Sequence, residues 1–143
     1  MTFLLILLTG SGLTFQAAIN SRLREYAGGA VLATLIQFTI GLILLLALAF
    51  GSNAFSGAAR LKTAPLWVFL GGALGVAYVS SAMIAVPRIG SSMLLITAVT
   101  GQMLASLAID HNGWFGVAPV PMSAKRVAGA VLLAAALWCL KRQ

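Results

Sequence analysis

Residues Gly71–Asp110 form a long apolar run that reads GGALGVAYVSSAMIAVPRIGSSMLLITAVTGQMLASLAID. It carries one basic side chain, Arg88, near its middle, and its one acidic side chain, Asp110, is its last residue. About 18 apolar residues suffice to cross a bilayer as a helix, so a stretch of this length predicts two membrane spans. Lipid offers the backbone no hydrogen-bonding partners, and each span must therefore be a helix.

A sharp turn between these two spans is predicted at residues 87–90, the sequence Pro–Arg–Ile–Gly. Arg88 lies in this turn, and an arginine at the centre of a membrane helix costs about 2.5–3.5 kcal/mol on insertion scales. The turn is therefore expected at a membrane surface or in a water-filled vestibule that reaches into the protein. The remaining spans are expected to pack around this pair of helices.

The composition of the whole chain indicates an integral membrane protein. The chain has 143 residues, of which 61% are hydrophobic and only 8% are charged, whereas roughly 25% are charged in an average soluble domain. The net charge of +7 does not indicate nucleic-acid binding, because the basic residues lie in short connections between apolar runs and form no basic face. At the ends of spans, Lys and Arg normally contact lipid head groups.

Apolar runs and polar connections predict five spans in a single membrane domain, residues 1–143. The first run resembles a signal peptide, but it lacks a basic N-terminal region and four further spans follow it, so we expect it to be retained. Trp67 lies where an aromatic anchor at the membrane interface is expected. The predicted spans cover about residues 3–19, 30–50, 65–87, 89–109 and 126–140.

The basic residues are divided almost evenly between the two sides of the predicted bundle, with four on one side and five on the other. The first group is Arg60, Lys62, Lys125 and Arg126, and the second is Arg22, Arg24, Arg88, Lys141 and Arg142. Since the Lys/Arg bias of short loops sets the orientation, such a chain is expected to insert both ways round. An antiparallel pair of chains would then have the inverted-repeat architecture of many transporters. The alternative is one fixed orientation, decided by a single charge or by the N-terminal amine.

Small residues recur at four-residue spacing in three of the predicted spans. Examples are Gly71 and Gly75, Gly101 and Ala105, and the Ala130–Ala134 pair. In lipid, helices gain nothing from burying apolar surface against each other, and small residues mark the places where their backbones can approach closely. These stripes therefore predict helix packing, either within one chain or at a contact between two chains.

Polar side chains inside the predicted spans gather mostly toward the end that bears the Arg88 turn. Amide and hydroxyl groups are unfavourable in hydrocarbon unless they face one another or water. The set therefore predicts either a substrate vestibule or hydrogen bonds that hold helices together, worth about 0.6 kcal/mol each. The candidate substrate-binding residues are Gln16, Asn20, Gln37, Tyr78, Ser81, Arg88 and Gln102.

Acidic residues are missing from the predicted spans, since Glu25 and Asp110 both lie at span ends. A proton-coupled cation antiporter usually needs a carboxylate inside the membrane, so simple proton–cation exchange is not expected. Cation–π binding by Tyr78 or a Trp is an alternative, but neutral polar or anionic solutes fit Arg88 and the amides better.

Catalysis and metal binding are not expected. Asp110 and His111 with a serine would resemble a catalytic set, but adjacent residues in a turn rarely face each other, and Asp110 before an Asn–Gly turn more simply caps the helix and the loop. The chain has one Cys, Cys139, and one His, too few for a zinc, haem or iron–sulfur site. We therefore expect no catalytic residue, no metal and no cofactor.

Several segments, taken together, resemble the YdcZ-type inner-membrane exporter family of the drug/metabolite transporter superfamily. They are QAAINSRL (16–23), GGALGVAYV (71–79), PRIGSS (87–92), GQMLASLAIDHNGWFG (101–116) and KRVAG (125–129). The resemblance covers nearly the whole chain and implies the bacterial inner membrane, a multi-pass protein with five spans, and a unit equivalent to one repeat of ten-span relatives. Members occur as single dual-topology chains, as paired chains or as fused proteins.

The resemblance also implies that Gln16, Asn20 and Gln102 are site or packing positions. The proton-antiport mechanism of small multidrug-resistance relatives is not carried over, because this chain has no glutamate in its first span.

These observations predict an all-α, dual-topology transporter subunit that exports a small polar solute or metabolite. Transport would proceed by alternating access at the interface of an antiparallel dimer. The expected partners are the solute, the lipid bilayer and a second copy of the chain or a paralogous five-span chain, and no nucleic acid. The alternatives are a dual-topology channel for a small ion and a non-transporting membrane subunit of a larger complex.

Overall fold

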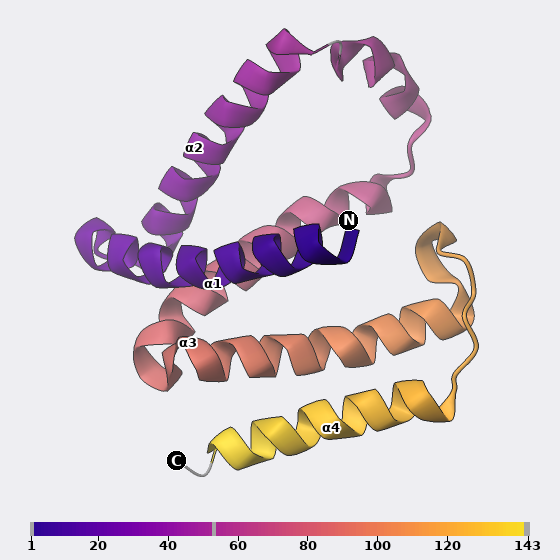
Figure 1. Cartoon of the computed structure of the whole chain (residues 1–143). Coiled ribbons are helices and arrows are strands. Elements are labelled where there is room, and N and C mark those ends of the chain that lie inside the picture. The colour runs from indigo at the N-terminus through magenta and orange to yellow at the C-terminus, as the bar shows by residue number, and fades with distance from the viewer. Residues whose placement is uncertain (1, 53, 142–143) are drawn as a thin grey trace. The chain divides into compact units, whose positions relative to one another are not determined.

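The computed structural model describes residues 2–52 and 54–141, and it consists of helices joined by short connections (Figure 1). None of these described residues lies in a strand, which confirms the prediction of an all-α chain. The α-helices are α1 (Thr2–Ala27), α2 (Ala30–Gly51), α3 (Leu70–Asn112) and α4 (Ala124–Lys141), and the 3-10 helices are η1 (Ala54–Thr63), η2 (Leu66–Phe69) and η3 (Trp114–Gly116).

Among the described residues, three helical stretches are long and apolar enough to cross a membrane: Thr2–Ala27, Ala30–Gly51 and Leu66–Asn112. The third has 47 residues, and at 1.5 Å per residue a helix of that length measures about 70 Å. The hydrocarbon core of a bilayer is only about 30 Å thick. The length therefore agrees with two consecutive spans in this stretch.

The chain forms two compact units, residues 1–88 and 89–143, and we describe each by itself. The first unit contains α1, α2, η1, η2 and the first half of α3. The second contains the rest of α3, η3 and α4. The single five-span domain stays a prediction.

Helix α1 extends well beyond residue 19, where the first span is predicted to end, and includes most of the segment expected to be a polar connection. No Gly or Pro interrupts this segment before Gly28, and Arg22 forms an ion pair with Glu25 one turn later, which supports a helix at a polar surface. The helix ends where Gly28 adopts φ +72°, a conformation that glycine adopts without steric cost.

Helix α3 bends at a single residue within the predicted turn. Its helical conformation continues through Pro87 and Arg88 and breaks at Gly90, which has φ 78° and ψ 163°. This backbone region is essentially restricted to glycine. Pro87 weakens the preceding turn, because it has no N–H to donate to the carbonyl of Met83. The predicted position of the turn is confirmed, and the proline and the glycine together account for it.

Few side chains are buried, and most large apolar side chains are exposed. This distribution is expected for helices that face lipid, because lipid tails are as apolar as the side chains they contact. The buried residues of the first unit are Asn20, Ser21, Ala33, Thr34, Ala82 and Met83, and those of the second are Thr100 and Leu107. The buried positions are therefore about as often polar as apolar.

The conformation of Gly90 leads to a stability prediction. Replacing Gly90 with Ala forces a Cβ into a backbone region that costs on the order of 1–3 kcal/mol, so the midpoint of thermal unfolding in detergent should fall. Gly41→Ala is the matched control, since Gly41 lies inside α2 and a Cβ added there would have no atom within 4 Å. Alanine is also favoured over glycine in a helix by about 0.5–1 kcal/mol. Equal midpoints for the two variants would contradict this explanation of the bend.

Candidate functional site

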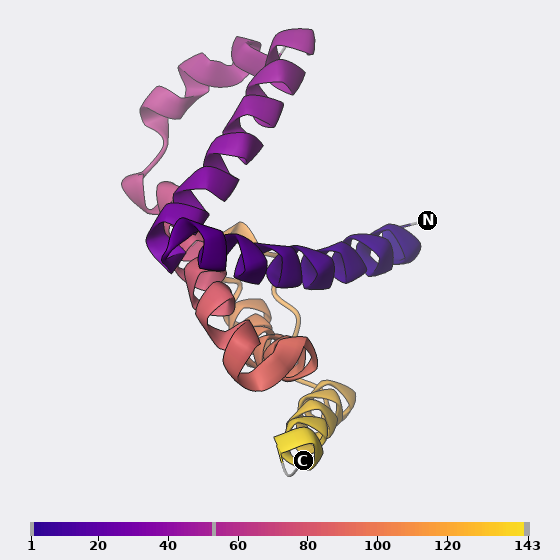
Figure 2. The same ribbon diagram turned by 90° about the vertical axis from the view of Figure 1, so that its left-hand side faces the viewer.

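The helices of the first unit meet near the connection between α1 and α2 (Figures 1 and 2). Polar side chains form hydrogen bonds between these helices. Asn20 of α1 donates a hydrogen bond from Nδ2 to Oε1 of Gln37 on α2, at 2.6 Å. Asn20 is only 6% exposed. The bond joins two apolar helices through their amide side chains, the arrangement that removes the energetic penalty of an amide in lipid.

A second polar contact joins α2 to the first half of α3. The hydroxyl groups of Thr34 and Ser80 are 2.8 Å apart, and the Thr34 hydroxyl also lies 3.7 Å from Sδ of Met83. Because a hydroxyl has one hydrogen, donation by Thr34 to the sulfur requires Ser80 to donate to Thr34. The three side chains then form one hydrogen-bonded chain, and Thr34 (3% exposed) and Met83 (0%) are its buried members.

A small cavity of about 20 Å³ lies between α1 and α3. This volume is enough for about one water molecule. From α1 it is lined by Leu13, Gln16, Ala17 and Asn20. From α3 it is lined by Tyr78, Val79, Ala82 and Met83. The α1 residues follow the spacing i, i+3, i+4 and i+7, so they lie on one face of the helix. We call this space the polar cavity.

A larger pocket of about 290 Å³ lies between α2 and α3, and its walls are almost entirely apolar. Its lining residues are Val31, Thr34, Leu35 and Phe38 of α2 and Val76 and Ser80 of α3. Phe38 also packs near Gly75, since a Cβ at Gly75 would lie 3.8 Å from the Phe38 ring. We call this space the apolar pocket.

The polar residues of both spaces lie toward the same end of their helices. Counting 1.5 Å per residue, Asn20 lies about 10 Å from the end of α1, Thr34 about 6 Å from the start of α2, and Ser80 about 15 Å from the bend at Gly90 in α3. Each distance is no more than about half the thickness of the hydrocarbon core. The hydrogen-bonded groups therefore lie in one half of the first unit, the half that contains Gly28 and the end at Arg88.

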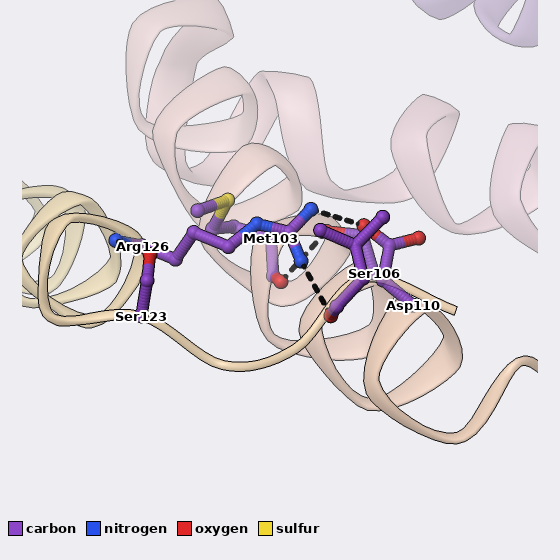
Figure 3. A network of polar contacts seen from close by, with 6 residues as sticks. Met103, Ser106, Asp110, Ser123 and Arg126 are labelled. Atoms are coloured by element: carbon purple, nitrogen blue, oxygen red, sulfur yellow. Dashed lines mark hydrogen bonds and ion pairs between the residues drawn. The ribbon is translucent and has the colours of Figure 1, made fainter. Parts of the chain in front are cut away.

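The second unit contains a polar network that joins the end of α3 to the start of α4 (Figure 3). Arg126 forms an ion pair with the carboxylate of Asp110, and the two side chains are 29% and 24% exposed. The other terminal guanidinium nitrogen of Arg126 donates to the carbonyl of Val120 at 3.2 Å, and the N–H of Val120 donates to the carbonyl of Asp110 at 2.8 Å. The three residues form a closed ring of interactions, which fixes the connection between the two helices.

The backbone of this connection depends on its glycines. Gly113 has φ +65° and Gly116 has φ +80°. A Cβ at Gly113 would lie only 2.8 Å from Cγ of Pro119, so the residue combines a left-handed conformation with close packing, and only glycine permits both. The pattern Asp110, Gly113 and Gly116 therefore has a local structural explanation. The two glycines let the connection turn back, and Asp110 forms the ion pair with Arg126 that holds it.

Comparison with known proteins identifies the family. The family model described as "Putative inner membrane exporter, YdcZ" matches residues 1–139. The chain belongs to this family. The resemblance found in the sequence is thereby confirmed, and the YdcZ family assignment indicates a membrane-embedded exporter rather than an enzyme. Neither the comparison with curated proteins nor the comparison with solved structures found a match.

In this YdcZ-family chain, four of the seven predicted site residues lie together. Gln16, Asn20 and Tyr78 line the polar cavity, and Gln37 is hydrogen-bonded to Asn20. The other three are exposed on α3 and are not among the described lining residues of either space: Ser81 and Arg88 in the first unit, and Gln102 in the second.

Three residues of the candidate site were not among the predicted site residues: Thr34, Ser80 and Met83. Thr34 lies three residues before Gln37, so the two side chains share a face of α2, and this spacing could have identified it. Ser80 and Ser81 are neighbours in the predicted polar half, and spacing alone does not indicate which hydroxyl faces another helix. Met83 gives no signal in a sequence rich in apolar residues.

The network in the second unit leads to a second prediction. Asp110→Asn should lower the free energy of unfolding, because a hydrogen bond to a charged group contributes about 1.5–3 kcal/mol. A double-mutant cycle with Arg126→Gln, followed by unfolding in detergent, should give a coupling energy of that order.

The matched control is the Arg22–Glu25 pair, whose side chains are 67% and 48% exposed. Its cycle, with Arg22→Gln and Glu25→Gln, should give less than about 1 kcal/mol. A coupling energy for Asp110 and Arg126 no larger than that of the control would contradict a structural role for the ring.

Proposed function

We propose that this chain is a subunit of an inner-membrane exporter that carries a small polar solute by alternating access between two antiparallel copies. The observation that carries the proposal is the meeting of polar side chains from three apolar helices, through the Asn20–Gln37 and Thr34–Ser80 hydrogen bonds. Membership of a family described as inner-membrane exporters supports it.

The amide groups of the site have hydrogen-bonding capacity for a solute. Each amide side chain has two donor hydrogens and two acceptor lone pairs, and the Asn20–Gln37 bond uses one hydrogen of Asn20 and one acceptor position of Gln37. Gln16 adds a further amide to the wall of the polar cavity. The amide donors and acceptors that this bond leaves unused cost free energy inside a membrane unless they have a hydrogen-bonding partner. Water or a polar solute in the cavity can be that partner.

The size of the polar cavity supports a mechanism with moving helices. At about 20 Å³ it has room for one water molecule, so this conformation is closed to a solute. Passage requires α1 and the first half of α3 to separate, and in an alternating-access dimer the closed half of one copy would accompany the open half of its inverted partner. A continuous pore, as in a channel, receives no support from a cavity of this size.

The charges support two copies of opposite orientation. Four basic residues are expected on one side of the bundle and five on the other, and each side contains one arginine paired with a carboxylate, Arg22 with Glu25 and Arg126 with Asp110. When the paired arginines are left out of the count, the two sides still differ by one basic residue. A bias of one residue is too small to impose one orientation.

The chemistry of the walls favours an uncharged solute at the polar cavity. Gln16, Asn20 and Tyr78 are its polar lining residues, and among the residues described no acidic or basic side chain lines either space. Proton–cation exchange through a membrane carboxylate is accordingly not part of the proposal. Ser81, Arg88 and Gln102, which are exposed in a single chain, are proposed to complete the pathway at the contact with the second copy.

The proposal predicts that Asn20→Ala abolishes export. Mass spectrometry of the medium from cells that produce the protein would first identify the solutes that accumulate outside. For these solutes the variant should lower accumulation by about five- to 150-fold, because loss of one amide partner leaves the other unpaired, at roughly 1–3 kcal/mol. Ser11→Ala is the matched control, since the exposed Ser11 hydroxyl bonds to the backbone of its own helix, at Leu7.

Equal amounts of protein in the membrane, checked for both variants, separate transport from insertion. Export by Asn20→Ala at the level of Ser11→Ala would show that the polar cavity is not part of the pathway.

A further inference from the structure

The polar cavity and the apolar pocket share the hydrogen-bonded chain of Thr34, Ser80 and Met83. Thr34 and Ser80 line the apolar pocket, and Met83 lines the polar cavity. The Thr34 hydroxyl contacts both of its partners, at 2.8 Å from Ser80 and 3.7 Å from the sulfur of Met83. The two spaces are therefore neighbours, and Thr34 is the residue through which their walls are connected.

The apolar pocket is a groove that is open on one side, and four of its six lining residues, Val31, Leu35, Phe38 and Val76, are exposed. Its volume of about 290 Å³ is at the lower end of the range of about 300–1,000 Å³ found for ligand pockets, which are mostly apolar with a few polar groups at fixed positions. Phe38, Val76 and two further aliphatic groups supply the apolar wall, and Thr34 and Ser80 supply the hydroxyls. An apolar cavity of about 150 Å³ is enough to bind benzene, so this volume is enough for a short alkyl chain or one ring.

The two spaces differ in the polarity of their walls. The walls of both spaces are mostly hydrocarbon, but the polar cavity also presents two amides and a phenol, whereas the apolar pocket presents only the hydroxyls of Thr34 and Ser80. Neither space is lined by a charged side chain within the described part of the chain. A solute that occupied both would need an uncharged hydrogen-bonding group at one end and an apolar group at the other. A purely polar solute would leave the apolar pocket empty, and a purely apolar one would leave the amides without a partner.

We infer that the solute of this site is amphipathic, with a neutral hydrogen-bonding head that binds at Asn20 and Gln37 and a short apolar tail that occupies the pocket beside Phe38 and Val76. The inference rests on the proposed function and names the substrate class of the same site. Binding of head and tail together requires the Thr34–Ser80 contact to open, so Thr34 controls the connection between the two spaces.

The test uses photoreactive probes on the full-length protein in lipid vesicles. The probe is hexanamide that carries a diazirine on its alkyl chain, and the reference probe is the same alkyl diazirine without the amide. After irradiation, mass spectrometry maps the labelled residues. The amide probe should label the peptide segments around Phe38 and Val76 about fivefold more than the reference probe, a ratio expected from one or two net amide hydrogen bonds.

Two substitutions test the tail and the head separately. Val76→Phe fills the apolar pocket and should remove the labelling, whereas Leu44→Phe, at an exposed position of α2 outside the pocket, should leave it unchanged. Asn20→Leu should reduce the ratio of labelling by the amide probe to labelling by the reference probe to about one, because the amide head has lost its hydrogen-bonding partner at residue 20. Competition by unlabelled octanamide should lower the labelling in the unsubstituted protein.

Three results would overturn the inference. Equal labelling by both probes would identify the occupant of the apolar pocket as lipid acyl chain. Cross-links from these segments to another chain would identify it as a second copy, and no labelling above that of Leu44 would show the pocket to be unoccupied. If Asn20→Ala still abolishes export, each of these results leaves the exporter proposal intact. Specific labelling of a protein that exports nothing would instead refute the exporter proposal and leave the binding site.

Discussion

The inability of lipid to satisfy a polar group is the constraint on which the rest of the structure depends. It requires the backbone of each apolar stretch to form a helix, and it requires side-chain amides and hydroxyls within those helices to find partners. In the first unit the Asn20–Gln37 and Thr34–Ser80 bonds join side chains of different helices, whereas a hydroxyl such as that of Ser11 bonds to the backbone of its own helix. In the second unit the ion pair of Asp110 and Arg126 lies in the connection between two helices, where charges are expected near a membrane surface.

The sequence alone predicted the features that depend on composition and on single residues. A chain that is 61% hydrophobic and 8% charged, with long apolar runs, indicates a membrane protein, and the proline and glycine at residues 87–90 locate the bend of α3. The length of α1 could not be predicted from hydropathy, because a helix continues through polar residues until a breaker such as Gly28 stops it. The choice of Ser80 over Ser81, and the Asp110–Arg126 pair, depend on which side chains of different elements face each other, and periodicity within one helix does not contain this information.

A transport function would use the same polar contacts that hold the helices together. Interhelical hydrogen bonds in membranes contribute on average only about 0.6 kcal/mol, so a solute with comparable hydrogen-bonding groups can replace them. This makes Asn20, Gln37 and Thr34 suitable both as helix contacts in the closed conformation and as solute contacts in an open one. The described lining residues of the polar cavity and the apolar pocket carry no charge. Protonation of a carboxylate in these spaces therefore would not be the source of the energy that drives export.

An antiparallel pair requires the chain to insert in both orientations, and this can be measured in bacterial cells. Single cysteines at Ala58 in η1 and at Tyr26 near the end of α1, in a Cys139→Ser background, leave the Lys and Arg residues unchanged, and both positions are exposed. An impermeant thiol reagent would be applied to intact and to permeabilised bacterial cells. The account predicts that each position is labelled from outside in about half of the molecules. Labelling of each position from one side only would contradict it.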